Sequence, residues 1–365
     1  MDLSVVIPCL NESETLAICI KKAKNQIDKL NINAEIIVSD NGSSDGSQEI
    51  ALNLGVKVSN CVKKGYGCAI INGINDSKGD YILIADADDS YDFNDLPKFY
   101  NEIKKGYNLV QGCRMPVGGG KIEKGAMPLS HRIIGNPFFS KLVKIFYDVK
   151  FNDVYCGMKI IDNEFFKNAK FFSDGWIFAL EILIKSKTMK AKVTEIPITL
   201  YKDGRINSKS HLKTIKDGLK TLKFILISSP KWIFFFPSIF FFILFTISTV
   251  FLLNTNNIET KFITLPLMFF YMSFQLFMLG LFSSLRARNL GLNNSIWLDK
   301  FFKFFSLRLS ALISLLVIFL PAFALKADYG ILPYETNIIL LSFSIFFGIS
   351  LIGNSLTIAL LSLNK

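Results

Sequence analysis

The sequence predicts an α/β domain built on a mostly parallel sheet, followed by an all-α region that crosses a membrane. Apolar strands alternate with helical patterns up to about Gln111, an order that is typical of parallel sheets. From Trp232 onward the chain becomes strongly apolar and rich in Phe, as membrane-spanning helices are. Its 365 residues are enough for both parts.

The charge and the cysteines limit the classes of function. A formal net charge of +11 points first to an anionic bilayer surface or a phosphorylated ligand. No nucleic-acid-binding motif accompanies this charge, so we expect no nucleic acid as a partner. The six Cys form neither a CxxC pair nor a zinc-binding pattern, which favours reduced thiols in a cytoplasmic domain. The N-terminus leads directly into a strand without a basic segment, so we expect no signal peptide there.

The first predicted unit is a strand, a tight turn and a helix. Residues 3–7 are β-rich, and Pro8 follows them. Asn11 and Glu14 have the spacing of a capping box, which predicts a helix beginning there. Asn11 and Glu12 stand where a nucleotide would lie beyond the strand. The alternative is that they only cap the helix.

Two further strands continue the alternation. Residues 34–39 form a buried strand that ends at Asp40, and a carboxylate at that point suits the hydroxyls of a ribose or the edge of a base. Residues 56–59 precede a loop that contains Lys64. That loop lacks the GxxxxGK[ST] pattern of a Walker A loop, and no GxGxxG follows the first strand, so a dehydrogenase is not expected.

The stretch GDYILIADADDSYDF carries the strongest chemical signal. The apolar run at residues 81–85 predicts a strand buried on both faces, and Asp86, Asp88 and Asp89 follow it directly. Ligands of open α/β sheets bind at this end of the strands. We therefore expect a divalent-metal site with a phosphorylated ligand, the alternative being an acidic, solvated turn. A calcium loop of the EF-hand type would need Gly at position six and Glu at position twelve, and both are absent.

Together these motifs resemble a known enzyme family. The segments VVIPCLNESETL, EIIVSDNGSSDGS, KKGYGCAIINGI and DYILIADADDSYDF are similar to successive motifs of the family 2 glycosyltransferases with the GT-A fold. Later segments, HRIIGNP, DVYCGMK and EIPI, resemble the dolichol-phosphate-mannose synthase branch. That branch moves a sugar from a nucleotide diphosphate to a polyprenyl phosphate. The resemblance covers about the first 210 residues.

The resemblance implies roles for individual residues. Asp86 and Asp88 match the DxD pair and would bind Mg²⁺ or Mn²⁺, hard ions that prefer oxygen ligands. Many members carry a Gln two residues after that pair, where this chain has Ser90. Either Ser90 or Asp89 would then complete the metal shell. The nucleotide-sugar-binding residues implied, besides Asp86, are Pro8, Asn11, Glu12, Asp40, Lys64, Arg205 and Lys209.

The second half of the domain would hold the acceptor. Arg114 and Arg132 would join the two aspartates as catalytic residues, because guanidinium groups bind phosphate oxygens bidentately. Arg132, Asp153, Gly157 and Glu181 are the acceptor-binding residues implied. For Arg114 a surface ion pair is the alternative, for Asp153 and Gly157 an ordinary turn, and for Glu181 a solvated helix face.

The domains are predicted as a catalytic domain over residues 1–205, a basic amphipathic helix over residues 206–231 and a membrane domain over residues 232–365. Apolar residues spaced by three and four, with lysines beside them, are typical of a helix that lies in the bilayer interface. The alternative is a helix packed on its own domain. Four spans are expected, at residues 232–253, 262–285, 309–325 and 338–363.

Basic residues indicate the orientation of these spans. The loop between the second and third spans carries Arg286, Arg288, Lys300, Lys303 and Arg308. The positive-inside rule places such a loop in the cytoplasm. An even number of spans then places the catalytic domain and both termini there, in a bacterial-type inner membrane.

The predicted function is therefore metal-dependent, inverting transfer of a hexose from a nucleotide-diphosphate sugar to undecaprenyl or dolichyl phosphate at the cytoplasmic membrane face. A processive polysaccharide synthase is the first alternative, although the Gln-x-x-Arg-Trp segment of such enzymes is absent. A catalytically silent membrane scaffold with the same fold is the second. The sugar, the nucleotide and the polyprenol length stay open, as does the oligomeric state, a homo-oligomer included.

Overall fold

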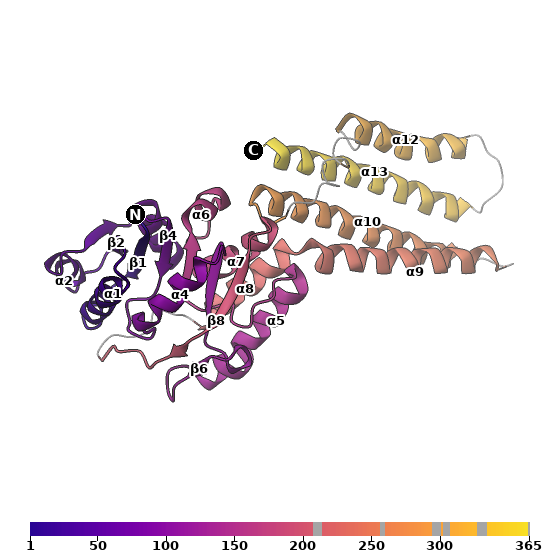
Figure 1. Cartoon of the computed structure of the whole chain (residues 1–365). Helices are drawn as coiled ribbons and strands as arrows, with labels where there is room; N and C mark the ends of the chain where they lie inside the picture. The colour runs from indigo at the N-terminus through magenta and orange to yellow at the C-terminus, as the bar shows by residue number, and fades with distance from the viewer. Residues whose placement is uncertain (207–213, 256–259, 294–300, 302–306, 327–333, 364–365) are drawn as a thin grey trace. The chain divides into compact units, whose positions relative to one another are not determined.

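The chain forms two compact units, Met1–Ile225 and Leu226–Lys365 (Figure 1). The computed structural model describes residues 1–206, 214–255, 260–293, 301, 307–326 and 334–363. Over these described residues, the first unit is built on a seven-stranded sheet and the second unit is helical. The predicted fold class, an α/β domain followed by a helical region, is confirmed. The domain boundaries at residues 205 and 231 stay predictions.

One mostly parallel sheet organises the first unit. Its strands are β1 (Leu3–Cys9), β2 (Ala34–Asp40), β3 (Lys57–Asn60), β4 (Tyr81–Ile84), β5 (Leu109–Cys113), β7 (Lys159–Asp162) and β8 (Val193–Pro197). They lie in the order β3-β2-β1-β4-β7-β5-β8. All neighbouring pairs are parallel except those of β7, which runs antiparallel to both β4 and β5. Two short strands, β6 (Lys121–Ile122) and β9 (Thr199–Leu200), form a separate parallel pair.

The central strands are apolar on both faces, which explains their position. Val5 and Val6 of β1 and Leu83 and Ile84 of β4 are fully buried. Strands of this kind need helices on both sides of the sheet. The helices of the first unit are α1 (Leu16–Leu30), α2 (Ser47–Asn53), α3 (Tyr66–Asn75), η1 (Phe93–Asp95), α4 (Leu96–Ile103), η2 (Pro116–Gly118), η3 (His131–Gly135), α5 (Asn136–Tyr147), α6 (Asn163–Ala169) and α7 (Phe178–Thr188). A further helix, α8 (Thr214–Ser228), extends across the division between the units. All six cysteines are buried and free, as expected of reduced thiols.

The antiparallel strand β7 determines which loops meet at the edge of the sheet. Ile84, the last residue of β4, is paired with Lys159, the first residue of β7. Because the two strands run in opposite directions, the loop that leads into β7 lies at the same edge as the loop that leaves β4. Gly157 is thereby brought next to Asp86.

The capping box predicted at Asn11 and Glu14 is wrong. Helix α1 begins at Leu16, its N-cap residue is Thr15, and no side chain caps it. Asn11 instead adopts a left-handed backbone conformation, with φ of 56°, which Asn tolerates better than most residues. Its side-chain oxygen accepts a hydrogen bond from Ser44 N at 2.8 Å. The amide thus ties the loop after β1 to the loop after β2.

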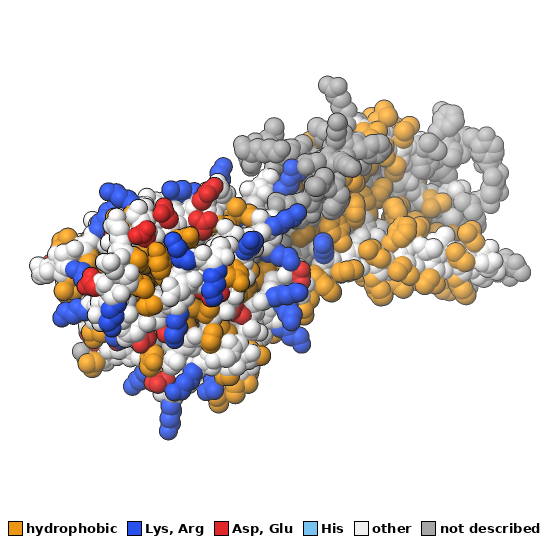
Figure 2. Space-filling model, viewed as in Figure 1, with side chains coloured by type: hydrophobic (Ala, Val, Ile, Leu, Met, Phe, Trp, Pro, Cys, Tyr) orange, Lys and Arg blue, Asp and Glu red, His pale blue; other side chains and the backbone are white. Residues whose placement is uncertain are grey.

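The second unit consists of long apolar helices: α9 (Phe236–Leu253), preceded by η4 (Lys231–Phe235), α10 (Thr260–Asn289), α12 (Leu307–Lys326) and α13 (Tyr334–Leu363). Among the described residues, three helical segments are long and apolar enough to cross a membrane, namely Lys231–Leu253, Phe262–Asn289 and Glu335–Ile358. They correspond to the first, second and fourth predicted spans. The third predicted span coincides with α12, a helix of 20 residues. Among the coloured side chains visible on the second unit most are hydrophobic, whereas the first unit displays many charges (Figure 2).

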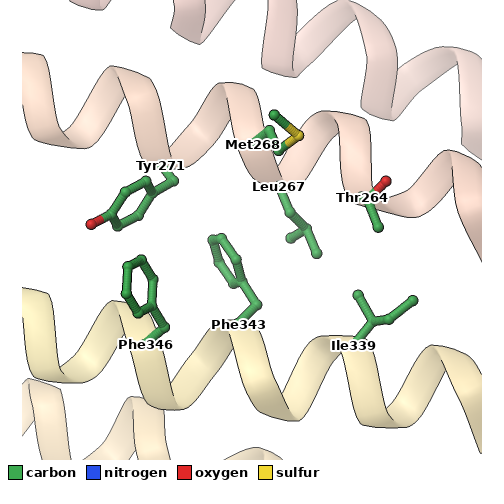
Figure 3. A pocket seen from close by; sticks show the side chains of 7 residues that line it. All are labelled: Thr264, Leu267, Met268, Tyr271, Ile339, Phe343 and Phe346. Atoms are coloured by element: carbon green, nitrogen blue, oxygen red, sulfur yellow. The ribbon is translucent and has the colours of Figure 1, made fainter.

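Small and polar residues join the helices of the second unit. Ser238 on α9 donates to Ser273 O on α10 at 2.8 Å, and Gln275 on α10 donates to Ser350 on α13. Such contacts hold apolar helices together inside a bilayer. A cavity of about 240 Å³ lies between α10 and α13, and its lining is almost wholly apolar (Figure 3). Its walls are Thr264, Leu267, Met268, Tyr271, Ile339, Phe343 and Phe346. Since this lining contains no charged side chain, the cavity is not a site for a nucleotide or a metal ion.

Candidate active site

The carboxyl edge of β1, β2 and β4 gathers most of the residues predicted to act on the nucleotide sugar. β1 ends just before Asn11 and Glu12, β2 ends with Asp40, and β4 leads into Asp86 and Asp88. Because the three strands are parallel, their carboxyl ends meet at one edge of the sheet, where open α/β sheets bind ligands.

Asp86 is a half-buried carboxylate. Its Oδ1 accepts a hydrogen bond of 2.8 Å from the hydroxyl of Tyr66. Burial and the neighbouring charge of Asp88 together raise the pKa of Asp86 to about 7, although the hydrogen bond from Tyr66 opposes this shift. Two carboxylates this close repel each other unless a cation lies between or beside them. The pair therefore has the electrostatic character of a cation site.

Asp88 is held by its own loop. Its Oδ1 accepts hydrogen bonds from Ser90 N at 3.1 Å and from Ser90 Oγ at 2.6 Å. Asp89 has a left-handed backbone, with φ of 57°, and its carboxylate pairs with Lys22 at 2.8 Å. Of the two residues considered as a further metal ligand, Ser90 is thus bonded to the DxD pair, whereas Asp89 has a cation of its own.

Arg205 is the cation that lies beside Asp88. Its Nη1 is 3.6 Å from Asp88 Oδ2 and 2.5 Å from Asp203 Oδ2. Its Nε donates to Glu12 Oε2 at 2.7 Å, and its Nη2 donates to the other oxygen of Glu12. Burial would lower the pKa of Arg205, but Glu12 and the neighbouring carboxylates raise it above its ordinary value. The guanidinium is therefore a permanent positive charge in the middle of an acidic group.

The residues at this edge fit a divalent ion that is shared with a ligand. Asp86 and Asp88 offer oxygen donors, the type that Mg²⁺ and Mn²⁺ prefer. Arg205 brings one positive charge against the carboxylates of Glu12, Asp88 and Asp203, so the excess negative charge still favours a further cation there. Over the ranges that the structure describes, no group of three or more His, Cys, Asp or Glu side chains is arranged to hold a metal alone. Two carboxylates plus the phosphates of a substrate are a common way to bind Mg²⁺.

Arg114 and Asp153 form a buried ion pair behind this edge. Arg114 Nε and Nη2 donate to the two oxygens of Asp153 at 2.7 and 2.9 Å, and Arg114 Nη1 donates to the hydroxyl of Tyr91 at 3.1 Å. Asn136 donates to Asp153 Oδ1 at 2.6 Å. Burial would raise the pKa of Asp153, but Arg114 and Asn136 together hold it below its ordinary value. The surface ion pair considered for Arg114 is therefore wrong, because Asp153 is 0% exposed.

Tyr91 connects this ion pair to the aspartates. Its hydroxyl accepts the bond from Arg114 and also a bond of 2.8 Å from Gly157 N. Gly157 in turn touches Asp86, since a Cβ atom built on Gly157 would lie 2.5 Å from Asp86 Oδ2 and 3.0 Å from the ring of Tyr91. The loop before β7 thus leaves no room for a side chain against Asp86.

We expect Gly157→Ala to reduce activity about 100-fold, because the methyl group must displace Asp86 and a shift of a reacting group by about 1 Å has costs of this order. The free energy of unfolding should fall by only about 1–3 kcal/mol, the usual cost of overpacking. Steady-state kinetics and thermal unfolding would measure the two effects. Gly175→Ala is the matched control, since a Cβ there meets nothing within 4 Å. Full activity in Gly157→Ala would contradict the close approach to Asp86.

The residues predicted to hold the nucleoside lie at the ends of β1 and β2. Pro8 is buried in β1 beside Ser39. Asp40 is 1% exposed and accepts hydrogen bonds from Gly42 N at 2.9 Å and from Gln48 Nε2 at 2.6 Å. Lys64 is exposed, and its ammonium donates to Asn41 O at 2.6 Å. Asp40 therefore already shapes the loop that follows it.

Three of the predicted residues lie apart from this group or cannot be placed. Arg132 is exposed on η3. Glu181 is fully buried, pairs with Lys185 at 2.7 Å and accepts a hydrogen bond from Ser173 N at 2.9 Å. The solvated helix face considered for Glu181 is thus wrong, and its carboxylate stabilises the chain before α7. Lys209 lies outside the described residues.

Several residues at the site were not singled out from the sequence. Tyr66 and Tyr91 lie within the segments KKGYGCAIINGI and DYILIADADDSYDF, but nothing in those segments indicates that their hydroxyls contact Asp86 and Arg114. Lys159 is 2% exposed and begins β7. Burial lowers its pKa to about 8, against the attraction of Cys156 and Asp86. A Lys at the start of an apolar strand was the one signal available for it, since Lys is rarely buried.

Comparisons with known proteins agree with this geometry. Residues 4–169 match the glycosyl transferase family 2. The low-salt glycan biosynthesis hexosyltransferase Agl6 of Haloferax volcanii is 33% identical over 237 residues, which are 64% of this chain and 55% of that protein. The dolichol-phosphate mannosyltransferase of Pyrococcus furiosus is 33% identical over 229 residues, 60% of this chain and 62% of that protein. The chain therefore spans less than two thirds of the length of either relative.

The fold has a counterpart among solved structures. The crystal structure of a mycobacterial protein matches with a TM-score of 0.51 at 17% identity, covering 62% of this chain and 74% of the other. At this identity the likeness concerns the fold alone. Residues 4–169 of the chain therefore match the glycosyl transferase family 2, and the first unit has the mostly parallel, Rossmann-like sheet of a GT-A fold.

Proposed function

We propose that the chain transfers a hexose from a nucleotide-diphosphate sugar to a polyprenyl phosphate at the cytoplasmic face of a membrane. The observation that carries this proposal is the pair Asp86 and Asp88 at the carboxyl edge of the parallel strands, with Arg205 3.6 Å from Asp88. This group of charges suits a divalent ion and a diphosphate. The names of the two relatives, a hexosyltransferase and a dolichol-phosphate mannosyltransferase, support the choice of sugar and acceptor class.

Asp86 and Asp88 would hold Mg²⁺ or Mn²⁺. The ion supplies Lewis-acid stabilisation of the diphosphate that leaves the sugar. The tyrosine that donates to Asp86 and the serine that donates to Asp88 keep the two carboxylates in place, which is the protein's part in building such a site.

Arg205 would bind the diphosphate. Its guanidinium bridges Glu12, Asp203 and Asp88, so three carboxylates share one cation. A diphosphate that arrives at Asp88 brings two phosphates to the same place, and guanidinium groups bind phosphate oxygens well. Glu12 then orients Arg205 from the side of β1, and Asp40, Pro8 and the loop of Lys64 would contact the nucleoside.

The acceptor explains why no strong general base is needed. A polyprenyl phosphate is already anionic at neutral pH, so its oxygen can attack the anomeric carbon directly as the bond to the diphosphate breaks. A single displacement of this kind inverts the configuration of that carbon. Arg132, exposed on η3, is our candidate for binding the acceptor phosphate. Asp153, Gly157 and Glu181 would act indirectly, by holding the loops around it.

Apolar surface on the first unit supports an acceptor that is presented by a bilayer. Helices α5 and α8 are in contact, since Tyr147 donates to Ile225 O at 3.1 Å. Both helices and the segments next to them expose apolar side chains, namely Leu129, Ile133, Ile134, Phe138, Ile215 and Leu219. Lysines lie among them on both helices. This mixture is typical of helices that lie in the bilayer interface, and the apolar helices of the second unit would anchor the chain in the bilayer.

The direct test incubates the purified full-length protein with Mn²⁺, a panel of nucleotide-diphosphate hexoses and either undecaprenyl or dolichyl phosphate. We expect one lipid-linked sugar that extracts into organic solvent and fails to form when EDTA removes the metal. Asp88→Asn protein is the control for a contaminating enzyme. Release of free sugar without a lipid product, or transfer in the presence of EDTA, would contradict the proposal.

A further inference from the structure

We propose that Tyr66, held by a ring stack on Trp176, is a positioning residue that fixes the side chain of Asp86 and thereby strengthens the binding of the divalent ion. This inference rests on the proposed function, in which Asp86 is a ligand of that ion. Neither aromatic residue belongs to the DxD pair: Tyr66 lies in the segment KKGYGCAIINGI, and Trp176 lies in none of the segments that resemble the family. They are joined to the pair only in three dimensions.

The first step is the contact with Asp86. Tyr66 is the first residue of α3, and its hydroxyl donates to Asp86 Oδ1 at 2.8 Å. The other oxygen, Oδ2, faces Gly157, where a Cβ would approach to 2.5 Å. A carboxylate that is bonded on one side and confined on the other cannot rotate freely. Because a metal ligand binds best when its orientation is already set, Tyr66 prepares Asp86 for the ion.

The second step is the stack that holds Tyr66. The rings of Tyr66 and Trp176 are 4.2 Å apart between centroids and 15° from parallel. Such offset stacking stabilises a ring beyond the burial of its surface. A Tyr side chain has only two rotatable torsions, so the stack and the bond to Asp86 leave it a single orientation.

The third step is the loop that carries Trp176. Asp174 O accepts a hydrogen bond of 3.0 Å from Cys68 N in α3. The segment around Tyr66 and the loop before α7 approach each other closely. A Cβ on Gly65 would lie 2.2 Å from Asp174 O, and a Cβ on Gly67 would lie 2.2 Å from Ser173 O. The glycines on both sides of Tyr66 are therefore required by this contact, and the stack forms where the contact brings the two chains together.

The fourth step is the buried ion pair behind the loop. Glu181 accepts hydrogen bonds from Phe172 N at 3.0 Å and from Ser173 N at 2.9 Å. Lys185 pairs with Glu181 and donates to Ala169 O at 2.9 Å. Both residues are at most 1% exposed. A continuous set of contacts thus extends from α7 through the loop and the stacked rings to Asp86.

The alternative is that Tyr66 is an ordinary core tyrosine, whose loss would affect only stability. A measurement of ion binding separates the positioning role from the structural role. Loss of a purely structural tyrosine would change the midpoint of thermal unfolding but leave the affinity of the folded protein for the ion unchanged. The test therefore needs a binding signal that does not depend on turnover.

The experiment measures free Mn²⁺ by electron paramagnetic resonance while the full-length protein is titrated, with uridine or guanosine diphosphate added in parallel. Thermal unfolding is recorded on the same samples. We expect Tyr66→Phe to raise the dissociation constant of Mn²⁺ about tenfold, the usual effect of losing a hydrogen bond to a charged group. Trp176→Leu should raise it severalfold through the freed Tyr66 ring, and Trp176→Phe, which keeps an aromatic partner, should restore most of the affinity. Tyr81→Phe is the matched control, because Tyr81 begins the strand whose other end leads to Asp86.

The outcomes distinguish the inference from the function on which it rests. If Asp88→Asn abolishes Mn²⁺ binding while Tyr66→Phe binds like the wild type, the inference is wrong and the metal site stands. If Asp88→Asn binds Mn²⁺ like the wild type, the metal site itself is wrong. A lower unfolding midpoint in Tyr66→Phe with unchanged affinity would also overturn the inference, since it would show a structural role only.

Discussion

Asp88→Asn is expected to lower the rate of sugar transfer by about 1,000-fold or more while the protein stays folded. The amide removes a negative ligand charge, and the stabilisation that a metal gives to a leaving diphosphate is worth several kcal/mol, each 1.36 kcal/mol being a factor of ten in rate. Folding should persist because Asp88 is only partly buried and Asn can still accept the bond from Ser90. Initial rates of lipid-linked product formation would measure the loss.

Asp95→Asn is the matched control for this change. Asp95 lies in the same connection between β4 and α4, but its carboxylate pairs with Lys98 at 2.6 Å, away from the DxD pair. The Asp95→Asn variant loses the same negative charge as Asp88→Asn and should retain nearly full activity. Wild-type rates in Asp88→Asn would rule out the metal assignment, and equal losses in both variants would point to the net charge of the loop instead.

Asp153→Asn is expected to lower the free energy of unfolding of the first unit by about 3–5 kcal/mol, because it leaves the charge of Arg114 buried without its partner. Asp153 is fully buried, and Arg114 is 8% exposed. For a domain of this size such a loss corresponds to a fall of about 10 °C in the unfolding midpoint. Thermal unfolding of the purified protein, followed by circular dichroism, would measure it.

Two further variants test the cause. Asp148→Asn breaks another ion pair, between Asp148 and Lys187 at 2.6 Å, but both of its side chains are at least half exposed. It should leave the midpoint unchanged, since surface pairs contribute little. The double variant Arg114→Met with Asp153→Leu removes both charges and should recover part of the stability. If Asp153→Asn unfolds at the wild-type temperature, Arg114 is not confined to this pair and is available for a substrate phosphate.

These two experiments also separate the roles of the predicted catalytic residues. Arg114 was predicted to bind a phosphate, yet all three of its donor nitrogens are engaged by Asp153 and Tyr91. Among the described residues, the side-chain partners of the Arg205 guanidinium are the carboxylates of Glu12, Asp88 and Asp203, so it can exchange one anion for another. The expected difference is that changes at Arg205 affect activity first, whereas changes at Arg114 affect stability first.

Much of the first unit follows from local patterns. The strands β1, β2 and β4 are runs of apolar residues, and their order with the helices between them predicts parallel neighbours. The carboxylates Asp40, Asp86 and Asp88 follow these strands in the sequence, so their common edge could be predicted as well. The apolar segments of the second unit are equally visible, because a span needs about 20 apolar residues in a row.

The rest depends on residues that are far apart in the chain. The spacing of Asn11 and Glu14 predicted Asn11 as a helix cap. Its side-chain oxygen instead accepts a hydrogen bond from Ser44 N, 33 residues away. The antiparallel direction of β7 brings Gly157 against Asp86, although the local sequence of β7 is only a short apolar run.

By itself, the sequence determined the alternation of strands and helices, the edge where the acidic residues lie, and the apolar helices of the second unit. All of these depend on the order of apolar and polar residues within short windows. Only the tertiary structure decided that Asp153 neutralises Arg114, that Arg205 lies among Glu12, Asp88 and Asp203, and that Trp176 stacks on Tyr66. The physical reason is that charges and rings select their partners by proximity in the folded chain, and no local pattern of the sequence records that proximity.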